Sequence, residues 1–509
     1  MNEKFGDHLA SNKQIYRIDR NLKQRPLAEK VVQGGIWVFS FRAISKILGF
    51  MRTVVLARLL SPIDFGLFGI SLLALSILET FSQTGVQPAL IRKKDNIQSY
   101  MDTAWTISVI RGVILFVILI SSAPVFAKFF NSPQATTIIR VIAISTLISG
   151  FKNIGLIFFE KELEFKKLFV FEISGALTDV TVALVLAFYL KSIWALVWAG
   201  LSANFVRLFM SFFIQSYRPQ FSFNKEKFKD LFAFGRWVLG SSILIFLVNQ
   251  GDDIFVGKMI GVSALGFYQM AYLISNLPAT EITNVISQIA FPTYSIIQND
   301  LQKLKKAYLE IFKTTMFISC PIAGGILVLG SDFTVLFLGD KWMPMVASMQ
   351  VLSLWGLIRS SGGLSAPLFQ ALNRPDIPTK LLLLKVSLLI LLIYPLTIKF
   401  GILGTAVAVL INALLVNPVA HYISINMIKG RSRDLLKGAF GPCVSAIIMI
   451  FIIEILKIWF ELGKDIYSFL ILVFLGIAIY LFCNFLLNKQ LVLSEIVFSA
   501  KLKAKFERN

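Results

Sequence analysis

"GGIWVFSFRAISKILGFMRTVVLARLLSPIDFGLF", residues 34–68, opens with an apolar run that is long enough to cross a membrane as a helix. The run nevertheless contains three cations, Arg42, Lys46 and Arg52. A shift of 200 positions lays it without a gap over "FGRWVLGSSILIFLVNQGDDIFVGKMIGVSALGFY", residues 234–268. The identical pairs are Gly35 and Gly235, Trp37 and Trp237, Val38 and Val238, and Gly66 and Gly266. This register predicts an internal repeat of membrane helices.

The composition places the chain in the membrane class. Of its 509 residues, 56% are hydrophobic and only 16% are charged, a balance that excludes a soluble globular protein of this size. About fourteen apolar runs of about 20 residues or more follow one another. They are roughly residues 31–57, 65–90, 104–127, 136–159, 169–190, 193–215, 232–257, 266–295, 310–330, 345–370, 379–399, 402–427, 437–457 and 466–487. The sequence predicts an all-α polytopic membrane protein.

The repeat also predicts how the helices are grouped. Six runs separate its two copies, an even number, so both copies have the same orientation in the membrane. A parallel repeat of this kind predicts two six-helix lobes around a central cavity, the architecture used for alternating access. The expected divisions are a basic tail at 1–30, an N-lobe with helices 1–6 at 31–220, a C-lobe with helices 7–12 at 221–430, accessory helices 13–14 at 431–488 and a basic tail at 489–509.

Positive charge gathers in alternate loops. The terminal tails and the loops on their side hold 31 of the 50 lysines and arginines, and the opposite loops hold 8. Positive charge in short loops stays on the cytoplasmic side, so both termini are expected in the cytoplasm. The net charge of +21 is spread over many segments. This spread indicates that the charge sets the orientation of the chain in the membrane, and it predicts no nucleic-acid partner. The C-terminal tail is expected either to contact anionic membrane lipids or simply to anchor the topology.

The cations of the first run fall on one face of a helix. At 100° per residue, Arg42, Lys46 and Arg52 share a face about 120° wide with small or polar residues, and the apolar residues occupy the rest. A charge facing lipid costs about 3 kcal/mol or more, so this face is expected to meet water or protein. An alternative stays open: Arg52 reaches the outer interface, while the other two cations pair with acids such as Glu79, Glu172 or Asp179.

The first lobe contains more cations than acids within its apolar runs. Its cations are Arg42, Lys46, Arg52, Arg111, Arg140, Lys152 and Arg207, against Glu79, Glu172 and Asp179. An excess of buried positive charge favours an anion from outside, and a phosphate or diphosphate matches arginine forks and lysine charges best. The candidate residues for binding such a headgroup are Arg42, Lys46, Arg52 and Arg207. The matching positions of the second copy hold Ser242, Phe246 and Asp252, so the repeat itself does not require the cations.

The second copy instead ends its first run with Asn249, Asp252 and Asp253. These residues are candidates for holding a coupling Na⁺ or proton, as are Glu79 and Asp179 in the first lobe; the alternative is that the adjacent aspartates cap an outer loop in water. We expect no catalytic residue, no metal site and no cofactor. The cysteines Cys320, Cys443 and Cys483 have no metal or disulfide spacing, and His8 and His421 are far apart.

The loop "LARLLSPIDFGLFG", residues 56–69, and the following "GVQPALIRKKD", residues 85–95, resemble a signature of one transporter group. This group is the polysaccharide-transporter branch of the multidrug/oligosaccharidyl-lipid/polysaccharide (MOP) exporter superfamily, and the likeness is greatest to Wzx-type flippases. The resemblance implies a V-shaped two-lobe fold with cations lining the lumen. It also implies that undecaprenyl-diphosphate-linked oligosaccharide repeat units are flipped from the cytoplasmic to the outer leaflet. The family has no fixed catalytic motif.

Further expectations follow from the resemblance. The protein would be located in the bacterial cell (inner) membrane. Its partners would be the polyprenyl-diphosphate-linked oligosaccharide, membrane lipids and, as candidates, a polysaccharide polymerase and export machinery. One alternative function is a drug or small-solute antiporter of the same superfamily, which would favour an acidic cavity. Another is a membrane glycosyltransferase or polymerase, which would need an acidic motif in a large outer loop. An ATP-driven pump is excluded, since "GDDIFVGKM", residues 251–259, lacks the phosphate-loop spacing.

Overall fold

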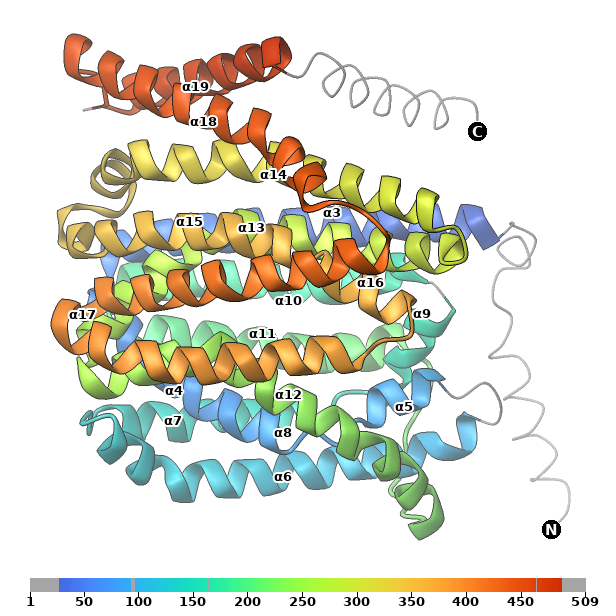
Figure 1. The fold of residues 1–509 in the computed structure, drawn as a ribbon. Coiled ribbons are helices and arrows are strands. Elements are labelled where there is room, and N and C mark those ends of the chain that lie inside the picture. The colour runs from blue at the N-terminus through green and yellow to red at the C-terminus, as the bar shows by residue number, and fades with distance from the viewer. Residues whose placement is uncertain (1–26, 93–96, 163, 464, 488–509) are drawn as a thin grey trace, which may run out of the picture. The chain divides into compact units, whose positions relative to one another are not determined.

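The computed structural model describes residues 27–92, 97–162, 164–463 and 465–487 (Figure 1). All regular secondary structure in these residues is helical. The chain divides into two compact units, unit 1 with residues 1–60 and 70–243, and unit 2 with residues 61–69 and 244–509. Each unit is described below by itself. The lobe boundaries predicted above stay a prediction.

The helices from α3 to α11, with the first part of α12, make up most of unit 1. They are α3 (Leu27–Leu59), α4 (Pro62–Phe81), α5 (Val86–Arg92), α6 (Gln98–Phe129), α7 (Ala135–Ile142), α8 (Ile144–Gly150), η1 (Ile154–Leu156), α9 (Ile157–Lys161), α10 (Phe165–Leu190), α11 (Trp194–Ile214) and α12 (Lys225–Met259). Within the unit, α10 packs against α3 and α11, and α6 packs against α7 and α8. These contacts place Arg52 of α3 beside Asp179 of α10.

One predicted membrane run of unit 1 is broken. The run expected at 136–159 forms α7 and α8, then η1 and α9, and the two parts meet at an angle of 64°. The helix stops at Gly150, and the next helical turn begins at Ile154. The sequence signals this break through Lys152, Asn153 and Gly155, because asparagine and glycine favour turns.

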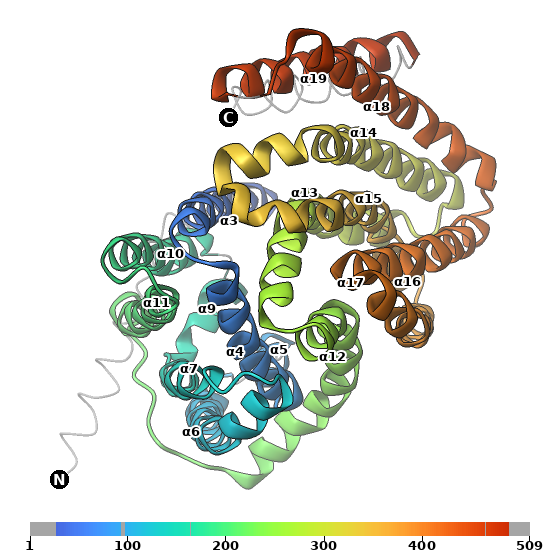
Figure 2. The ribbon, with the colours of Figure 1, turned by 90° about the vertical axis from the view of Figure 1, so that its left-hand side faces the viewer.

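The remaining helices belong to unit 2. They are α13 (Val262–Ile297), α14 (Leu301–Phe333), η2 (Thr334–Leu338), η3 (Asp340–Met345), α15 (Val346–Gly362), α16 (Ser365–Ala371), α17 (Asp376–Met427), α18 (Ser432–Phe460) and α19 (Ile466–Leu487). Viewed along the helices in Figure 2, α18 and α19 lie on one side of α14, and α13 and α15 lie on its other side. Helix α17 packs against α15.

Helix α17 is too long for one crossing. Its 52 residues would extend about 78 Å if straight, more than twice the hydrocarbon thickness. Gly401, with φ 60° and ψ −139°, interrupts the helical backbone, and Figure 1 shows the two arms folded back alongside each other. The Asn412 side chain donates a 2.7 Å hydrogen bond to the backbone oxygen of Lys385 and so joins the arms. The predicted runs 379–399 and 402–427 are these two arms.

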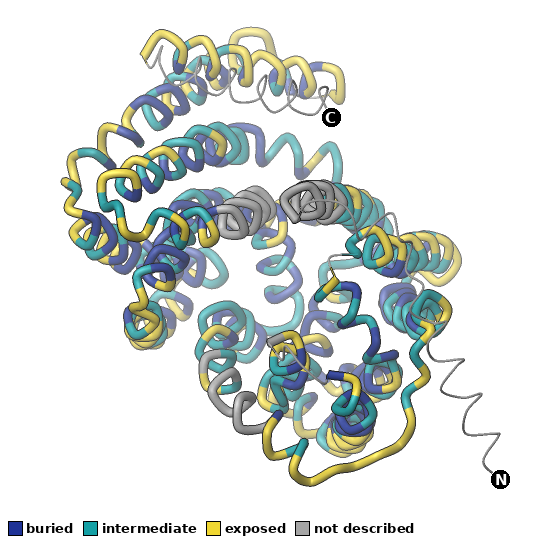
Figure 3. Tube along the Cα trace, turned by 90° about the vertical axis from the view of Figure 1, so that its right-hand side faces the viewer, coloured by how far each residue is buried: buried dark blue, intermediate teal, exposed yellow. Residues whose placement is uncertain are grey.

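Eight described helices are long and apolar enough to cross a membrane, or nine when the broken pair in unit 1 is counted as one span. Exposed positions recur along these helices (Figure 3). Many of them are large apolar side chains, such as Trp459, which is 80% exposed, and Phe482, which is 64% exposed. Surfaces of this kind are stable in lipid and not in water. The chain is therefore an all-α polytopic membrane protein, as predicted. The number of fourteen spans stays a prediction.

Residues that the repeat pairs across 200 positions meet inside unit 2. A Cβ atom at Gly66 would lie 1.9 Å from the backbone oxygen of Val262, and a Cβ atom at Gly266 would lie 2.0 Å from that of Pro62. The two contacts are equivalent under the shift, so the starts of α4 and α13 are related by a local two-fold. Trp342 packs against Phe65 and Phe267, the neighbours of the two glycines, and forms a T-shaped ring contact with each. Only glycine permits backbones to approach this closely.

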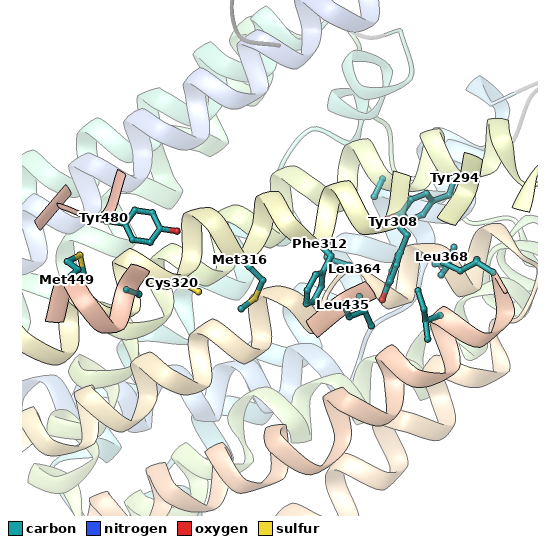
Figure 4. Packing of buried hydrophobic residues seen from close by; sticks show 14 of the residues in the cluster. Tyr294, Tyr308, Phe312, Met316, Cys320, Leu364, Leu368, Leu435, Met449 and Tyr480 are labelled. Carbon is teal, nitrogen blue, oxygen red and sulfur yellow. The ribbon is translucent and has the colours of Figure 1, made fainter. Parts of the chain in front are cut away.

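Each unit has a packed core. In unit 2, aromatic and aliphatic side chains of α13, α14, α16, α18 and α19 form a continuous cluster, shown in Figure 4. Ion pairs flank it: Lys457 of α18 and Asp332 of α14 are 2.6 Å apart, and Lys305 of α14 and Asp434 of α18 are 2.8 Å apart. A smaller cluster in unit 1 joins α5, the start of α6 and α9. These cores hold the polar residues described next in fixed positions.

Candidate functional site

The first polar group of unit 1 lies where α3 meets α10. Arg52 of α3 donates a hydrogen bond to the carboxylate of Asp179 and forms an ion pair with it. The two side chains are 21% and 25% exposed, so the pair is largely shielded from solvent. Asp179, a coupling candidate in the sequence, is therefore the counter-ion of one of the predicted binding cations. The alternative interpretation of the sequence also paired Asp179 with a cation of this helix, but with Arg42 or Lys46 and not with Arg52.

The other predicted cations of unit 1 have different surroundings. Lys46 is exposed on α3, next to the exposed Ile47. Arg42 lies on the same helix, but its side chain is outside the described residues. The stripe of α3 therefore has one cation matched by an acid and one on an exposed surface. The binding role of Arg42, Lys46 and Arg52 stays a prediction.

A second polar group of unit 1 joins α10, α11 and the break after α8. Arg207 of α11 has its Nε 3.4 Å from a carboxylate oxygen of Glu172 on α10, and its side chain lies against Gly175. This Nε is buried and makes no hydrogen bond within the described part of the chain. Lys152, at the break, has its Nζ 3.4 Å from the side-chain oxygen of Asn204 on α11. The group thus contains two cations and one acid.

Glu79, the remaining acid of unit 1, lies near the end of α4. Arg111 of α6 donates hydrogen bonds of 2.9 Å to the backbone oxygens of Glu79 and Ser82, and so caps this helix end. The carboxylate of Glu79 lies within electrostatic reach of Arg111 and Lys152. The structure thus places Glu79 among cations, and its coupling role stays a prediction.

The predicted coupling residues of unit 2 lie on one face of α12. Asp252 is 3% exposed, and one of its carboxylate oxygens accepts a 2.7 Å hydrogen bond from the Tyr268 hydroxyl of α13. Its other oxygen, and one oxygen of Asp253, have no hydrogen-bond partner among the residues described. Asn249 lies one turn earlier on the same face. A buried carboxylate with an unsatisfied oxygen requires a cation or a proton.

Arg359 of α15 is a cation near this carboxylate. It donates a 2.7 Å hydrogen bond to the Tyr272 hydroxyl and a 3.4 Å hydrogen bond to the side-chain oxygen of Asn249. Its guanidinium lies over the Trp355 ring, 4.9 Å from the centroid, a cation–π contact. Tyr272 and Asn249 lie one turn from Tyr268 and Asp252 on their helices. Two polar contacts therefore join α12 to α13. One is the hydrogen bond between Asp252 and Tyr268, and the other passes from Asn249 through Arg359 of α15 to Tyr272.

A further polar chain leads from this group through α17. Lys385, half-buried on α17, lies within electrostatic reach of Arg359 and of His421. The Nδ1 atom of His421 is 2.9 Å from the Tyr308 hydroxyl, which is 3.2 Å from the Ser365 hydroxyl. Buried polar groups linked in this way are costly unless each is satisfied.

The sequence interpretation did not assign a binding role to Lys152, Arg359 or Lys385. Each was detectable as a charge within an apolar run, the signal by which Arg42 was found. The repeat does not indicate Arg359 or Lys385, because both lie outside its two copies. In the described residues no group of three or more His, Cys, Asp or Glu is placed to hold a metal ion. Cys320 and Cys443 approach to 3.7 Å between their sulfur atoms.

Relatives with curated descriptions are similar over much of the chain. The lipopolysaccharide biosynthesis protein WzxC of Escherichia coli (strain K12) is 26% identical over 412 residues, which cover 80% of this chain and 83% of the relative. The teichuronic acid biosynthesis protein TuaB of Bacillus subtilis (strain 168) is 27% identical over 295 residues, or 58% of this chain and 61% of the relative.

The fold is similar to that of a solved membrane protein. The structure of the lipid II flippase MurJ, in an inward closed conformation, matches with a TM-score of 0.74 at 16% identity, covering 89% of this chain and 99% of that one. At this level of identity the likeness shows the fold alone. Residues 55–347, more than half of the sequence, match a family described as polysaccharide biosynthesis protein. The chain belongs to this family of polysaccharide biosynthesis proteins.

Proposed function

We propose that this protein is a flippase that moves undecaprenyl-diphosphate-linked oligosaccharide repeat units from the cytoplasmic to the outer leaflet, by alternating access, for surface polysaccharide export. Its membership of a polysaccharide biosynthesis family and its fold, shared with a protein named as a lipid II flippase, support this function. So does the name of WzxC, a lipopolysaccharide biosynthesis protein. The protein is a transporter and not an enzyme.

The observation that carries the proposal is the set of cations on membrane helices of unit 1. A diphosphate and several sugars cannot cross hydrocarbon unaided, because each unpaired polar group costs kilocalories and each charge costs more. Arg52, Arg207 and Lys152 lie in apolar segments and contact neighbouring helices. Together with Arg42 and Lys46 they supply the positive charge that a lipid-linked diphosphate needs. A drug antiporter for organic cations would favour acids at these places.

The proposed coupling site is in unit 2. Asp252 and Asp253, with Asn249, would take up Na⁺ or H⁺, because a buried carboxylate must be neutralised when the site closes. Glu79 and Asp179 remain secondary candidates in unit 1. No other cofactor is required, since a negative cell interior itself drives an anion outward.

The proposed location is the bacterial cell (inner) membrane, with both termini in the cytoplasm, in accord with the positive charge of the alternate loops. The proposed partners are the polyprenyl-diphosphate-linked oligosaccharide and the lipids around it. A polysaccharide polymerase and export machinery on the outer side would consume the flipped substrate. Nucleic acid is not a proposed partner.

The test uses purified protein in proteoliposomes containing a polyprenyl-diphosphate-linked saccharide with a fluorescent label on the sugar. A membrane-impermeant reductant then bleaches only the outward-facing label. The protein should make the inner pool accessible within minutes, and empty liposomes should retain about half of the signal. The double variant Arg42→Ala/Lys46→Ala should insert normally and lose this activity. Protein that moves no label in the wild-type form would refute the proposal.

A further inference from the structure

The break between α8 and η1 is held open by specific bonds. Residues 151–153 are not helical, although they lie inside an apolar stretch. Non-helical backbone at membrane depth is tolerated only where it is buried in protein or lines an aqueous space. Breaks of this kind often form the binding sites of transporters.

Asn153 supplies most of the bonds at this break. Its side-chain oxygen accepts from the Gly155 backbone at 2.8 Å, its backbone donates to the Ser211 hydroxyl at 3.0 Å, and its side-chain nitrogen donates to the Tyr217 backbone oxygen at 2.6 Å. Gln215 also donates to the Gly155 oxygen at 2.7 Å. The break is therefore a built feature fixed to α11 and the segment after it. Lys152 is held beside α11 as a result.

Lys152 forms no ion pair with an acid among the described residues. Within the described chain its amine reaches one side-chain acceptor, the neutral oxygen of Asn204 at 3.4 Å, and no carboxylate lies within ion-pairing distance. The acid Glu172 instead lies against Arg207, at 3.4 Å. Lys152 and Arg207 are within electrostatic reach of each other, so they repel. Glu79 also lies within electrostatic reach of Lys152, but it is shared with Arg111. Three cations, Lys152, Arg207 and Arg111, therefore face two acids, and such an excess of shielded positive charge is favourable when a further anion is present.

We propose that Lys152, Arg207 and Asn204 form an anion subsite that binds the phosphate groups of the lipid-linked substrate. This inference rests on the proposed function and assigns it a site at the helix break. Lys152 provides a point charge, the guanidinium of Arg207 directed N–H donors, and Asn204 an amide donor, which together match phosphate oxygens. On α3, Arg52 is already paired with Asp179, whereas this subsite brings two cations together.

Binding is tested on purified full-length protein in nanodiscs with farnesyl diphosphate as the probe. Lys152→Gln should weaken binding at least tenfold, and Lys152→Arg should stay within about threefold of wild type, because charge and reach are retained. Lys128→Gln, an exposed lysine at the end of α6, is the matched control and should bind like wild type. A folded Lys152→Gln variant with wild-type affinity would overturn the subsite.

A second variant separates binding from a purely structural role. Asn204→Asp places a carboxylate beside Lys152 and so supplies the missing counter-ion. The melting midpoint should be unchanged or higher, while farnesyl diphosphate affinity falls at least tenfold. If Lys152 only stabilised the break, this variant would keep its affinity, and that result would also overturn the subsite.

Further probes identify the source of the anion. Farnesol, which lacks phosphate, should not compete with farnesyl diphosphate, and inorganic pyrophosphate should compete only weakly. Pyrophosphate that competes as well as the lipid would overturn the assignment to a lipid headgroup. The liposome assay keeps the two proposals apart. Wild-type flipping with unchanged flipping by Lys152→Gln and Asn204→Asp refutes the subsite alone, and absence of wild-type flipping refutes the proposed function.

Discussion

At the scale of single residues, the acids on membrane helices differ in whether a cation already neutralises them. Asp179 pairs with Arg52, whereas Asp252 accepts only the hydroxyl of Tyr268 and keeps one oxygen without a hydrogen-bond partner among the described residues. Arg359, one turn away, contacts Tyr272 and Asn249 and does not form an ion pair with Asp252. A carboxylate in this state is able to exchange a proton or bind Na⁺. Asp179 is not in this state.

Asp252→Asn should therefore uncouple transport from the ion gradient. The amide keeps the shape and the contact with Tyr268 but has no negative charge, so it cannot take up a proton and cannot neutralise Na⁺. In proteoliposomes the wild-type flipping rate should change severalfold when a pH or Na⁺ gradient is imposed, and the variant should respond to neither. Asp300→Asn, at the start of α14, is the control and should respond like wild type. An unaltered response of Asp252→Asn would exclude this carboxylate as the coupling group.

Asp179→Asn should destabilise the protein instead. It leaves the guanidinium of Arg52 partly shielded without its counter-ion, at a cost of roughly 1 to 3 kcal/mol, because both groups retain some solvent contact. The melting midpoint in detergent should fall by several degrees, and Asp179→Glu should recover most of the loss. Asp376→Asn breaks an exposed pair with Arg374 and should lower the melting midpoint much less, because solvent screens this pair. Equal effects of the two asparagine variants would show that the shielded Arg52–Asp179 pair contributes no more to stability than the exposed Arg374–Asp376 pair.

At the scale of elements, the start of α4 is defined by its own sequence and by its partner. Ser61 and Asp64 form a capping box: the Ser61 backbone N–H donates to the Asp64 carboxylate at 2.9 Å, and the Asp64 backbone N–H donates to the Ser61 hydroxyl at 3.2 Å. Pro62 occupies the first helical position, where its missing donor has no cost. This fixed end then packs against the start of α13 through Gly66 and Gly266. The repeated sequence thus reappears as a repeated contact.

Gly66→Ala should force these two helix starts apart. The new Cβ would lie 1.9 Å from the Val262 backbone oxygen, which cannot rotate away as a side chain would. Overpacking of this kind costs about 1 to 3 kcal/mol. Gly266→Ala should have a similar effect, since it meets the Pro62 oxygen at 2.0 Å. Both variants should show a lower melting midpoint and slower flipping in liposomes.

The matched control for this prediction is Gly325→Ala on α14, where a Cβ would meet nothing within 4 Å. It should be neutral or slightly stabilising, because alanine favours helix over glycine by about 1 kcal/mol. Gly66→Ala with the stability and flipping rate of Gly325→Ala would contradict the close packing described for α4 and α13.

At the scale of the whole molecule, the sequence predicted what depends on local composition. Apolar runs mark membrane helices because hydrocarbon thickness sets their length, and α17 contains two of the runs as its two arms. The runs at 65–90, 136–159 and 345–370 are instead each divided between two or more helices. Local composition does not indicate contacts between segments that are distant in the sequence. The partner of Arg52 lies 127 positions away, and Arg359 reaches Asn249 over 110 positions. Charge counts favour an anion site in the first lobe, but only the coordinates show that no described acid lies within ion-pairing distance of Lys152.

The membrane potential should act on the whole transport cycle. Moving one charge across 100 mV is worth about 2.3 kcal/mol, so a diphosphate with about two negative charges gains about 4 to 5 kcal/mol on moving out of a negative interior. The final distribution of labelled lipid should then shift about a thousandfold per 100 mV. If one cation enters through the Asp252 site for each lipid exported, its inward movement adds to the outward movement of two negative charges. The potential then acts on about three charges, and the distribution changes more per 100 mV. Potentials set with valinomycin and K⁺ gradients measure this slope. Asp252→Asn should return the slope to about two charges, and a distribution that ignores the potential would contradict electrogenic flipping.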